Sequence, residues 1–185
     1  MTNEPIKISA AAKNYAEALI EIVKSGKSGY DVFAADLGTV GEVLKSSVDL
    51  SVAMENPAID SDIKNNIIDD VFGGKISPEL INFLKILVDK RRFSEFPQIY
   101  AEFINRYNKI QNIQPVTVVS AIKLSKVQQS QIVDKLSAKL NKQILPVWET
   151  DEDIIAGIMV KIDDNVLDMS LKYRIEKLGK SLMLK

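Results

Sequence analysis

The sequence contains no cysteine and no histidine among its 185 residues. The absence of cysteine excludes disulfides, thiolate nucleophiles and thiolate metal sites. The absence of histidine removes the commonest general base and the commonest transition-metal ligand. Carboxylates and lysines remain, but most enzyme classes are disfavoured by these two absences. We therefore expect a protein that is not an enzyme and that holds neither a cofactor nor a metal ion.

The chain also lacks an excess of charge of either sign and any long apolar run. Its formal net charge is −1, and no basic stripe typical of nucleic-acid-binding proteins is visible. The longest uninterrupted apolar run is Ile154–Val160, far short of the ~20 residues that span a bilayer. The N-terminal segment resembles neither a secretory signal nor an Arg-rich transit peptide. We expect no nucleic-acid partner, no direct insertion into a membrane, and a cytoplasmic location.

Helical patterns extend almost without a break over residues 1–110. Apolar residues recur there at spacings of three and four, and glycine pairs or the Asn56-Pro57 step interrupt them. Ser77 followed by Pro78 indicates the start of one helix, because proline is favoured at the first helical position. These signals predict five long helices and one short one, packed as a bundle.

The pattern changes after about residue 111, where alternating β-branched residues replace the helical spacing. This alternation predicts three strands, at Val116–Ile122, Ile144–Glu149 and Ile154–Ile162. Pro146 has no backbone N–H, so the second strand is expected at an edge of its sheet. A turn at residues 163–165 leads to a short return strand, Val166–Leu167.

Two helices complete this second part. Ser125 and Gln128 have the spacing of a capping box, and the helix that they open runs to about Asn141. Ser170 is expected to cap a terminal helix. The sequence therefore predicts a mainly α protein, in which an N-terminal six-helix bundle at residues 1–110 precedes a small α+β domain at residues 111–185.

Three groups of residues resemble functional motifs without matching them. Gly26-Lys27-Ser28 resembles the end of a phosphate-binding loop, but Glu21 stands where the first glycine is required. Four clusters of carboxylates lack the spacing of a calcium-binding loop and are interpreted as caps, turns and solvated faces. They are Asp60/Asp62, Asp69/Asp70, Asp151/Glu152/Asp153 and Asp163/Asp164. The basic run Asp89–Arg92 has two open explanations, stabilisation of a helix C-terminus and contact with an anionic partner.

Two helices are apolar over more of their circumference than a core-facing stripe requires. The apolar residues of Ala11–Val23 cover roughly 200° and those of Leu80–Val88 roughly 220°, against a stripe of ~100°. Two explanations remain open from the residues alone. Either both helices are central and buried all round, or part of each arc lines an exposed groove for a partner's amphipathic helix.

Five stretches of the chain resemble one known family when their order and spacing are taken together. They are AAKNYAEAL (Ala11–Leu19), NPAI (Asn56–Ile59), ELINFLKILVDKRRFSEF (Glu79–Phe96), VTVVSAIKLSKVQQSQI (Val116–Ile132) and the closing stretch Ile154–Met183. In these stretches the chain resembles the delta subunit of F-type ATP synthases, known in mitochondria as the oligomycin-sensitivity-conferring protein. Asp163 and Met169 depart from the family, which often has glycine or another small residue there.

The resemblance implies a non-catalytic stator subunit at the cytoplasmic face of a bacterial inner membrane, present in one copy per enzyme. In the family, the N-terminal bundle binds the amphipathic N-terminal helices of the alpha subunits, and the C-terminal part engages the C-terminal end of the peripheral-stalk b subunit. The alternative is a generic helical adaptor in another complex. Carried onto this sequence, the resemblance implies a groove for the alpha-subunit helix formed by Tyr15, Ala16, Leu19, Ile20, Phe83, Ile86, Leu87, Asp89 and Lys90.

Overall fold

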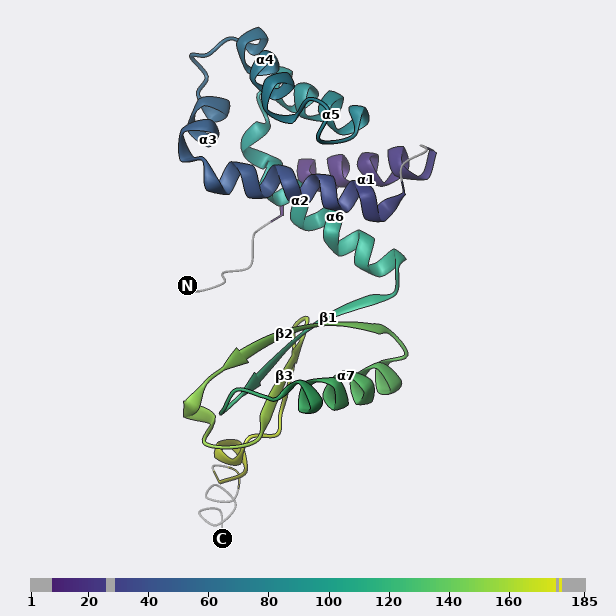
Figure 1. The fold of residues 1–185 in the computed structure, drawn as a ribbon, viewed down its shortest axis with the longest axis vertical. Helices are drawn as coiled ribbons and strands as arrows, with labels where there is room; N and C mark the ends of the chain where they lie inside the picture. Colours follow the sequence, from purple (N-terminus) through teal and green to yellow (C-terminus); the bar gives the residue numbers. More distant parts are fainter. Residues whose placement is uncertain (1–7, 26–28, 176, 178–185) are drawn as a thin grey trace. The chain divides into compact units, whose positions relative to one another are not determined.

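The computed structural model of the chain describes residues 8–25, 29–175 and 177. It divides into two compact units, Met1–Tyr107 and Asn108–Lys185, called here the helical unit and the sheet unit (Figure 1). The chain is mainly helical with one small four-stranded sheet, which confirms the prediction of a mainly α protein with a small sheet. The division falls at Tyr107, whereas the sequence pattern suggested residue 110.

The described residues of the helical unit form six α-helices and one short 3-10 helix. They are α1 (Ala10–Ser25), α2 (Tyr30–Ser46), α3 (Val48–Glu55), α4 (Ser61–Phe72), α5 (Pro78–Asp89), η1 (Phe93–Glu95) and α6 (Phe96–Ile110). All of them contribute to one apolar core, whose largest fully buried side chains include Phe33, Phe96 and Phe103. The rings of Phe33 and Phe103 lie 5.8 Å apart and join α2 to α6. Burial of each such ring stabilises the fold by about 1.5–3 kcal/mol.

The start of α5 lies where the sequence predicts it, but its cap comes from another helix. Ser77 is the N-cap residue and Pro78 follows it, yet the Ser77 side chain makes no capping hydrogen bond. Instead, the backbone N–H of Ser77 donates to the Asp36 carboxylate at 2.8 Å. Because a carboxylate is favoured at a helix N-terminus, Asp36 stabilises α5 and ties it to α2.

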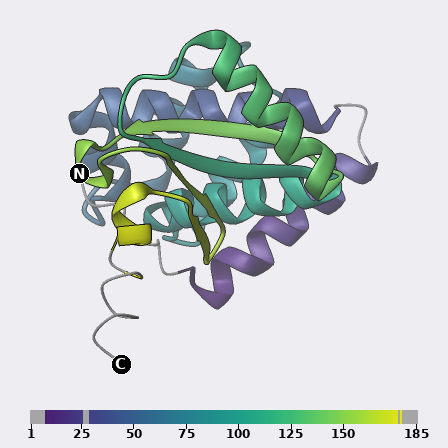
Figure 2. The ribbon, with the colours of Figure 1, turned by 90° about the horizontal axis from the view of Figure 1, so that it is seen from below.

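The sheet unit is an α+β fold with strand order β2-β1-β3-β4. Its elements are β1 (Ile113–Ser120), α7 (Lys126–Leu140), β2 (Gln143–Thr150), η2 (Glu152–Ile154), β3 (Ile158–Ile162) and β4 (Asn165–Asp168). β1 and β2 are parallel, so α7 is the crossover helix that such a pair requires. The other two pairs are antiparallel. In Figure 2, α7 runs along one face of the sheet, where Ile132, Leu136 and Leu140 pack on the core.

Two local predictions in this unit are confirmed. Ser125 and Gln128 form a complete capping box at the start of α7, with both reciprocal hydrogen bonds present. β2 is an edge strand, as Pro146 predicted. Gln143 and Asp151 each donate a backbone N–H toward β1. By alternation, Pro146 therefore falls where an N–H would point away from the sheet.

The predicted strand Ile154–Ile162 is wrong over its first four residues. The Asp151 carboxylate accepts a hydrogen bond from the Asp153 N–H at 3.0 Å and starts the 3-10 helix η2 there. Ile155 and Gly157 then have positive φ angles of 68° and 91°, which are incompatible with an extended strand. β3 therefore begins only at Ile158. β1 is also shifted, since it begins at Ile113 and ends before Ile122.

Two of the motifs noted in the sequence fall wholly or partly outside the described residues. Gly26-Lys27-Ser28 lies outside the described residues, and so does the part of the predicted terminal helix beyond Lys177. The start of that helix is described. The Ser170 hydroxyl accepts a hydrogen bond from the Tyr173 N–H at 3.1 Å, which confirms the predicted cap.

Candidate partner-binding surfaces

α5 is buried over most of its circumference. Its five core residues are Leu80, Phe83, Leu84, Leu87 and Val88. Burial in the core therefore accounts for most of the broad apolar arc of α5. For these five residues the first of the two explanations, a central and buried helix, holds. Ile86 is different, because 49% of its surface is exposed. Among the described residues, Ile86 is not part of the apolar core of the helical unit.

α1 shows the same division between a buried arc and an apolar margin. Ala12, Ala16, Leu19, Ile20 and Val23 are buried. Tyr15 is half-buried, while Ala18 and Ile22 are exposed. In a helix, residues at i, i+3 and i+7 lie on one side, so these three form a row beside the core face.

Tyr15 joins this row to α5. Its ring meets the ring of Phe83 edge-on, with the centroids 6.1 Å apart and the planes at 73°, a favourable aromatic geometry. Ile86 and Lys90 lie three and seven residues after Phe83 and therefore share its side of α5. We call the accessible set Tyr15, Ala18, Ile22, Ile86 and Lys90 the α1–α5 surface.

The nine residues implied by the family resemblance separate into three groups. Five of them are buried in the core beneath the surface and are not accessible to a partner: Ala16, Leu19, Ile20, Phe83 and Leu87. Tyr15, Ile86 and Lys90 are accessible and belong to the α1–α5 surface. Asp89 is exposed but lies on the other flank of α5, where Asn65 of α4 donates to its carboxylate at 3.5 Å.

Sequence reasoning missed two accessible members of this surface, Ala18 and Ile22. The signal was present, because both follow Tyr15 at helical spacing. Periodicity alone does not distinguish the buried centre of the apolar arc of α1 from its exposed margin.

The opposite flank of α1 is polar and fixed to α6. Arg106 forms ion pairs with Glu102 at 2.8 Å and with Glu17 of α1 at 3.3 Å. The hydrogen bond to Glu102, together with the charges of both carboxylates, raises the pKa of the Arg106 guanidinium. The ion pair between Arg106 and Glu17 joins this flank of α1 to α6.

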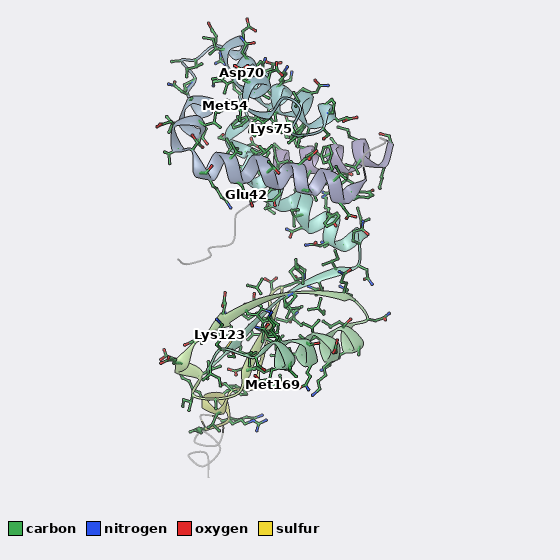
Figure 3. The ribbon with its side chains drawn as sticks, in the orientation of Figure 1. Glu42, Met54, Asp70, Lys75, Lys123 and Met169 are labelled. Carbon is green, nitrogen blue, oxygen red and sulfur yellow. The ribbon has the colours of Figure 1, made fainter. Side chains whose placement is uncertain are left out.

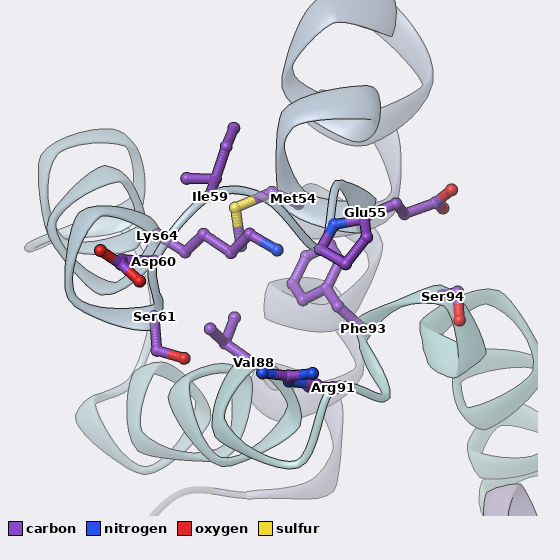
Figure 4. A pocket seen from close by; sticks show the side chains of 11 residues that line it. Met54, Glu55, Ile59, Asp60, Ser61, Lys64, Val88, Arg91, Phe93 and Ser94 are labelled. Carbon is purple, nitrogen blue, oxygen red and sulfur yellow. The ribbon is translucent and has the colours of Figure 1, made fainter.

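A pocket lies between α3, α4 and α5, but the buried Lys64 side chain in it has a structural role. The pocket has a volume of about 200 Å³ and holds Lys64 and Arg91 (Figure 4). Lys64 is only 8% exposed, and its ammonium donates to the Asn56 carbonyl at 2.7 Å. Asn56 is the C-cap residue of α3, so Lys64 satisfies a carbonyl at the negative end of that helix.

We predict that Lys64→Met destabilises the helical unit by about 1–2 kcal/mol, because the Asn56 carbonyl loses its charged donor. Lys75→Met is a matched control. Its ammonium also donates to a backbone carbonyl, that of Val71 at 2.9 Å, but the side chain is exposed (Figure 3). This control should change stability by less than about 0.5 kcal/mol. Urea unfolding followed by far-UV circular dichroism measures both. Equal midpoints for the two variants would contradict the capping role of Lys64.

The sheet unit presents a second apolar surface, on the face opposite α7. Leu145 and Val147 of β2 are exposed there, and Val166 of β4 is exposed in the same row as Val147. Lys161 lies between them and pairs with Glu149 at 3.9 Å. We call Leu145, Val147 and Val166 the open sheet face. Antiparallel and mixed sheets often leave one face to solvent, but such a face is then usually polar.

Among the described residues, the carboxylates do not gather into a group that could hold a metal ion. No helix in that part of the chain has both the length and the apolar character needed to cross a membrane.

Comparison with known proteins relates nearly the whole chain to one family. The family model described as ATP synthase delta (OSCP) subunit matches residues 11–182. ATP synthase subunit delta of Chlorobaculum parvum is 32% identical over 173 residues, covering 94% of this chain and 95% of that protein. The subunit of the same name from a Synechococcus species is 34% identical over 169 residues, covering 91% and 92%.

A solved structure shows the same fold. A chain in the Toxoplasma gondii mitochondrial ATP synthase hexamer superposes with a TM-score of 0.74 at 21% identity. The superposition covers 95% of this chain and 98% of that chain, so both units are included. With the family match over nearly the full length, the chain belongs to the ATP synthase delta (OSCP) subunit family.

Proposed function

We propose that this chain is the stator subunit that ties the catalytic head of an F-type ATP synthase to its peripheral stalk. The subunit is structural and carries out no chemistry. During synthesis the central shaft exerts torque on the head, and the head must resist it. An adaptor with two separate binding surfaces meets this need without a cofactor.

The α1–α5 surface is proposed to bind the amphipathic N-terminal helix of an alpha subunit. In this proposal residues 1–110 form one six-helix bundle that binds the catalytic head, and α1 and α5 form the side that contacts the alpha subunit. The carrying observation is Ile86, an isoleucine with half of its surface exposed beside the Tyr15–Phe83 contact. An apolar row flanked by Lys90 suits a helix that has an apolar stripe and a carboxylate at its margin.

The sheet unit, residues 111–185, is proposed to engage the C-terminal end of the b subunit. The open sheet face supports this assignment, because Leu145, Val147 and Val166 expose an apolar surface that no described residue covers. Stable interfaces are built around such an apolar centre with a polar rim. In keeping with the family resemblance, we propose one copy per enzyme at the cytoplasmic face of the bacterial inner membrane.

Two titrations with the full chain test the proposal. In one, the chain is titrated with the isolated catalytic head, before and after proteolytic removal of the alpha-subunit N-termini. In the other, it is titrated with a soluble C-terminal fragment of the b subunit. We expect binding to the intact head and to the b fragment, and loss of binding to the trimmed head. Unchanged binding to the trimmed head would contradict the alpha-subunit assignment.

The alternative function, a generic helical adaptor in another complex, is not favoured, because the family match covers nearly the entire chain. Copurification from native membranes discriminates the two. Alpha and b subunits should be recovered with the chain, and a set of partners without them would favour the generic adaptor.

A further inference from the structure

The helical unit contains an apolar groove that is separate from the α1–α5 surface. It lies between α2, α3 and α6, has a volume of about 610 Å³, and exposes more apolar than polar surface. Phe93, Phe96, Tyr100 and Ile104 supply aromatic and aliphatic side chains on the α6 side, and Leu44 supplies one on the α2 side. We call it the α2–α6 groove.

The wall formed by α2 has little side-chain cover. Gly38 and Gly41 both line the groove. A Cβ added at Gly41 would meet nothing within 4 Å, and one added at Gly38 would meet only the Tyr100 hydroxyl at 3.6 Å. Glycine within a helix reduces stability relative to alanine, so two of them on one side mark a place of close backbone approach. An incoming helix can therefore lie directly against α2.

The length of the groove and the charges at its rim define the kind of helix that fits. Gly38 and Lys45 are seven residues apart on α2, which corresponds to about 10 Å, or two helical turns. Glu42 of α2 and Glu55 of α3 stand at the rim with Lys45, and none of the three belongs to an ion pair among the described residues. Glu42 lies on the outer side of α2 (Figure 3). The rim is therefore net acidic.

We propose that the α2–α6 groove binds a second amphipathic helix, supplied by another subunit of the same complex. This helix has apolar residues at i, i+3 or i+4, and i+7 along at least two turns, and a lysine or arginine that meets Glu42 and Glu55. The proposal rests on the assembly role proposed above for the chain. It assigns a separate surface on a different side of the helical unit, with an acidic rim.

The absence of cysteine gives a direct test in the assembled enzyme. Gly41→Cys places a single thiol in the groove, in space that accommodates a side chain. Thr39→Cys is the matched control, because Thr39 is exposed on α2 and two residues earlier, and therefore lies on nearly the opposite side of the helix. Both variants are labelled with a maleimide, first as the free chain and then in the purified ATP synthase.

We expect both thiols to react at similar rates in the free chain. On assembly, labelling of Gly41→Cys should slow at least roughly tenfold, while that of Thr39→Cys should change less than about twofold. A photo-crosslinker attached at Gly41→Cys should join an amphipathic segment with basic residues in another subunit. Gly41→Leu, which fills the groove, should then release this segment to protease, and Gly41→Ala should not.

Two results would overturn the proposal. Equal labelling of Gly41→Cys in the free chain and in the complex would show that the groove stays open. Slow labelling already in the free chain would show that the chain itself covers it. Failure of both variants to enter the complex would instead contradict the proposed assembly role, so the two failures are distinguishable.

Discussion

Replacing Ile86 with glutamate is expected to weaken binding of an alpha-subunit N-terminal peptide by roughly 10- to 100-fold, a loss typical of a central interface residue. Ile86 is an exposed isoleucine of α5, and it lies one turn from the Phe83 ring that contacts Tyr15. In the complex a carboxylate there would be removed from water without a partner, which costs more than the lost apolar contact alone. Calorimetric titration of the full chain with the peptide measures the change.

The fold should survive this substitution, because exposed positions tolerate charge within about 0.5 kcal/mol. Ile63→Glu is a matched control, since Ile63 of α4 is 53% exposed and lies outside the α1–α5 surface. This variant should bind within about twofold of the native chain. Equal affinities for Ile86→Glu and Ile63→Glu would contradict the proposed surface. Leu87 is unsuitable for such a test, because it is fully buried and a charge there would unfold the helical unit.

Replacing Gly157 with alanine is expected to destabilise the sheet unit by about 2–4 kcal/mol, through backbone strain and a steric clash. Gly157 has a φ of 91°, and a Cβ there would lie 2.6 Å from the Met169 carbonyl oxygen. Two hydrogen bonds flank this close approach. Met169 donates its N–H to the Ile158 carbonyl at 3.0 Å, and Leu171 donates to the Ala156 carbonyl at 2.8 Å. The two segments therefore cannot separate without loss of both bonds.

The chain contains a single tryptophan, Trp148 of β2, whose fluorescence reports unfolding of the sheet unit. Guanidinium unfolding followed at this residue should show an earlier midpoint for Gly157→Ala. Gly41→Ala makes the same chemical change in open space within a helix, so it should stabilise the helical unit by about 0.5–1 kcal/mol and leave the tryptophan transition unchanged. A native midpoint for Gly157→Ala would show that the close approach is not required.

Local structural features that depend on only a few residues close together in the chain could be predicted from the sequence. The capping box of α7 depends only on Ser125 and Gln128, and the edge position of β2 follows from the missing N–H of Pro146. The start of β3 was predicted too early because Ile155 adopts a positive φ that β-branched residues rarely take. That conformation is imposed by the surrounding structure and leaves no signal in the pattern of apolar residues.

The departure at Asp163 shows the same dependence on contacts distant in sequence. Asp163 has a φ of 49° in the turn between β3 and β4, where glycine would be favoured. Its carboxylate oxygens each accept a hydrogen bond from the buried Gln114 side chain at 3.2 Å. Gln114 also accepts from Lys142 at 2.9 Å, so the aspartate joins the turn to β1 and to the start of β2. This compensation depends on residues 49 positions apart.

For the proposed α1–α5 surface, the sequence indicates the two helices but not which of their residues are accessible. The broad apolar arcs of α1 and α5 identified the two helices. Which members of each arc face a partner depends on the packing of α4 and α6, which fixes the rotation of both helices. Leu87 and Ile86 are neighbours of equal hydrophobicity in the sequence, yet one is fully buried and the other half exposed.

The most direct test of the account is reconstitution of coupling. Membranes are stripped of the catalytic head and of their native delta subunit, and the head is added back with or without this chain. ATP-driven proton uptake is then followed by quenching of a pH-sensitive dye. We expect the head to bind the membranes, and ATP-driven proton uptake to appear, only when the chain is present. Full pumping without the chain, or none in its presence, would contradict its role as the link between head and stalk.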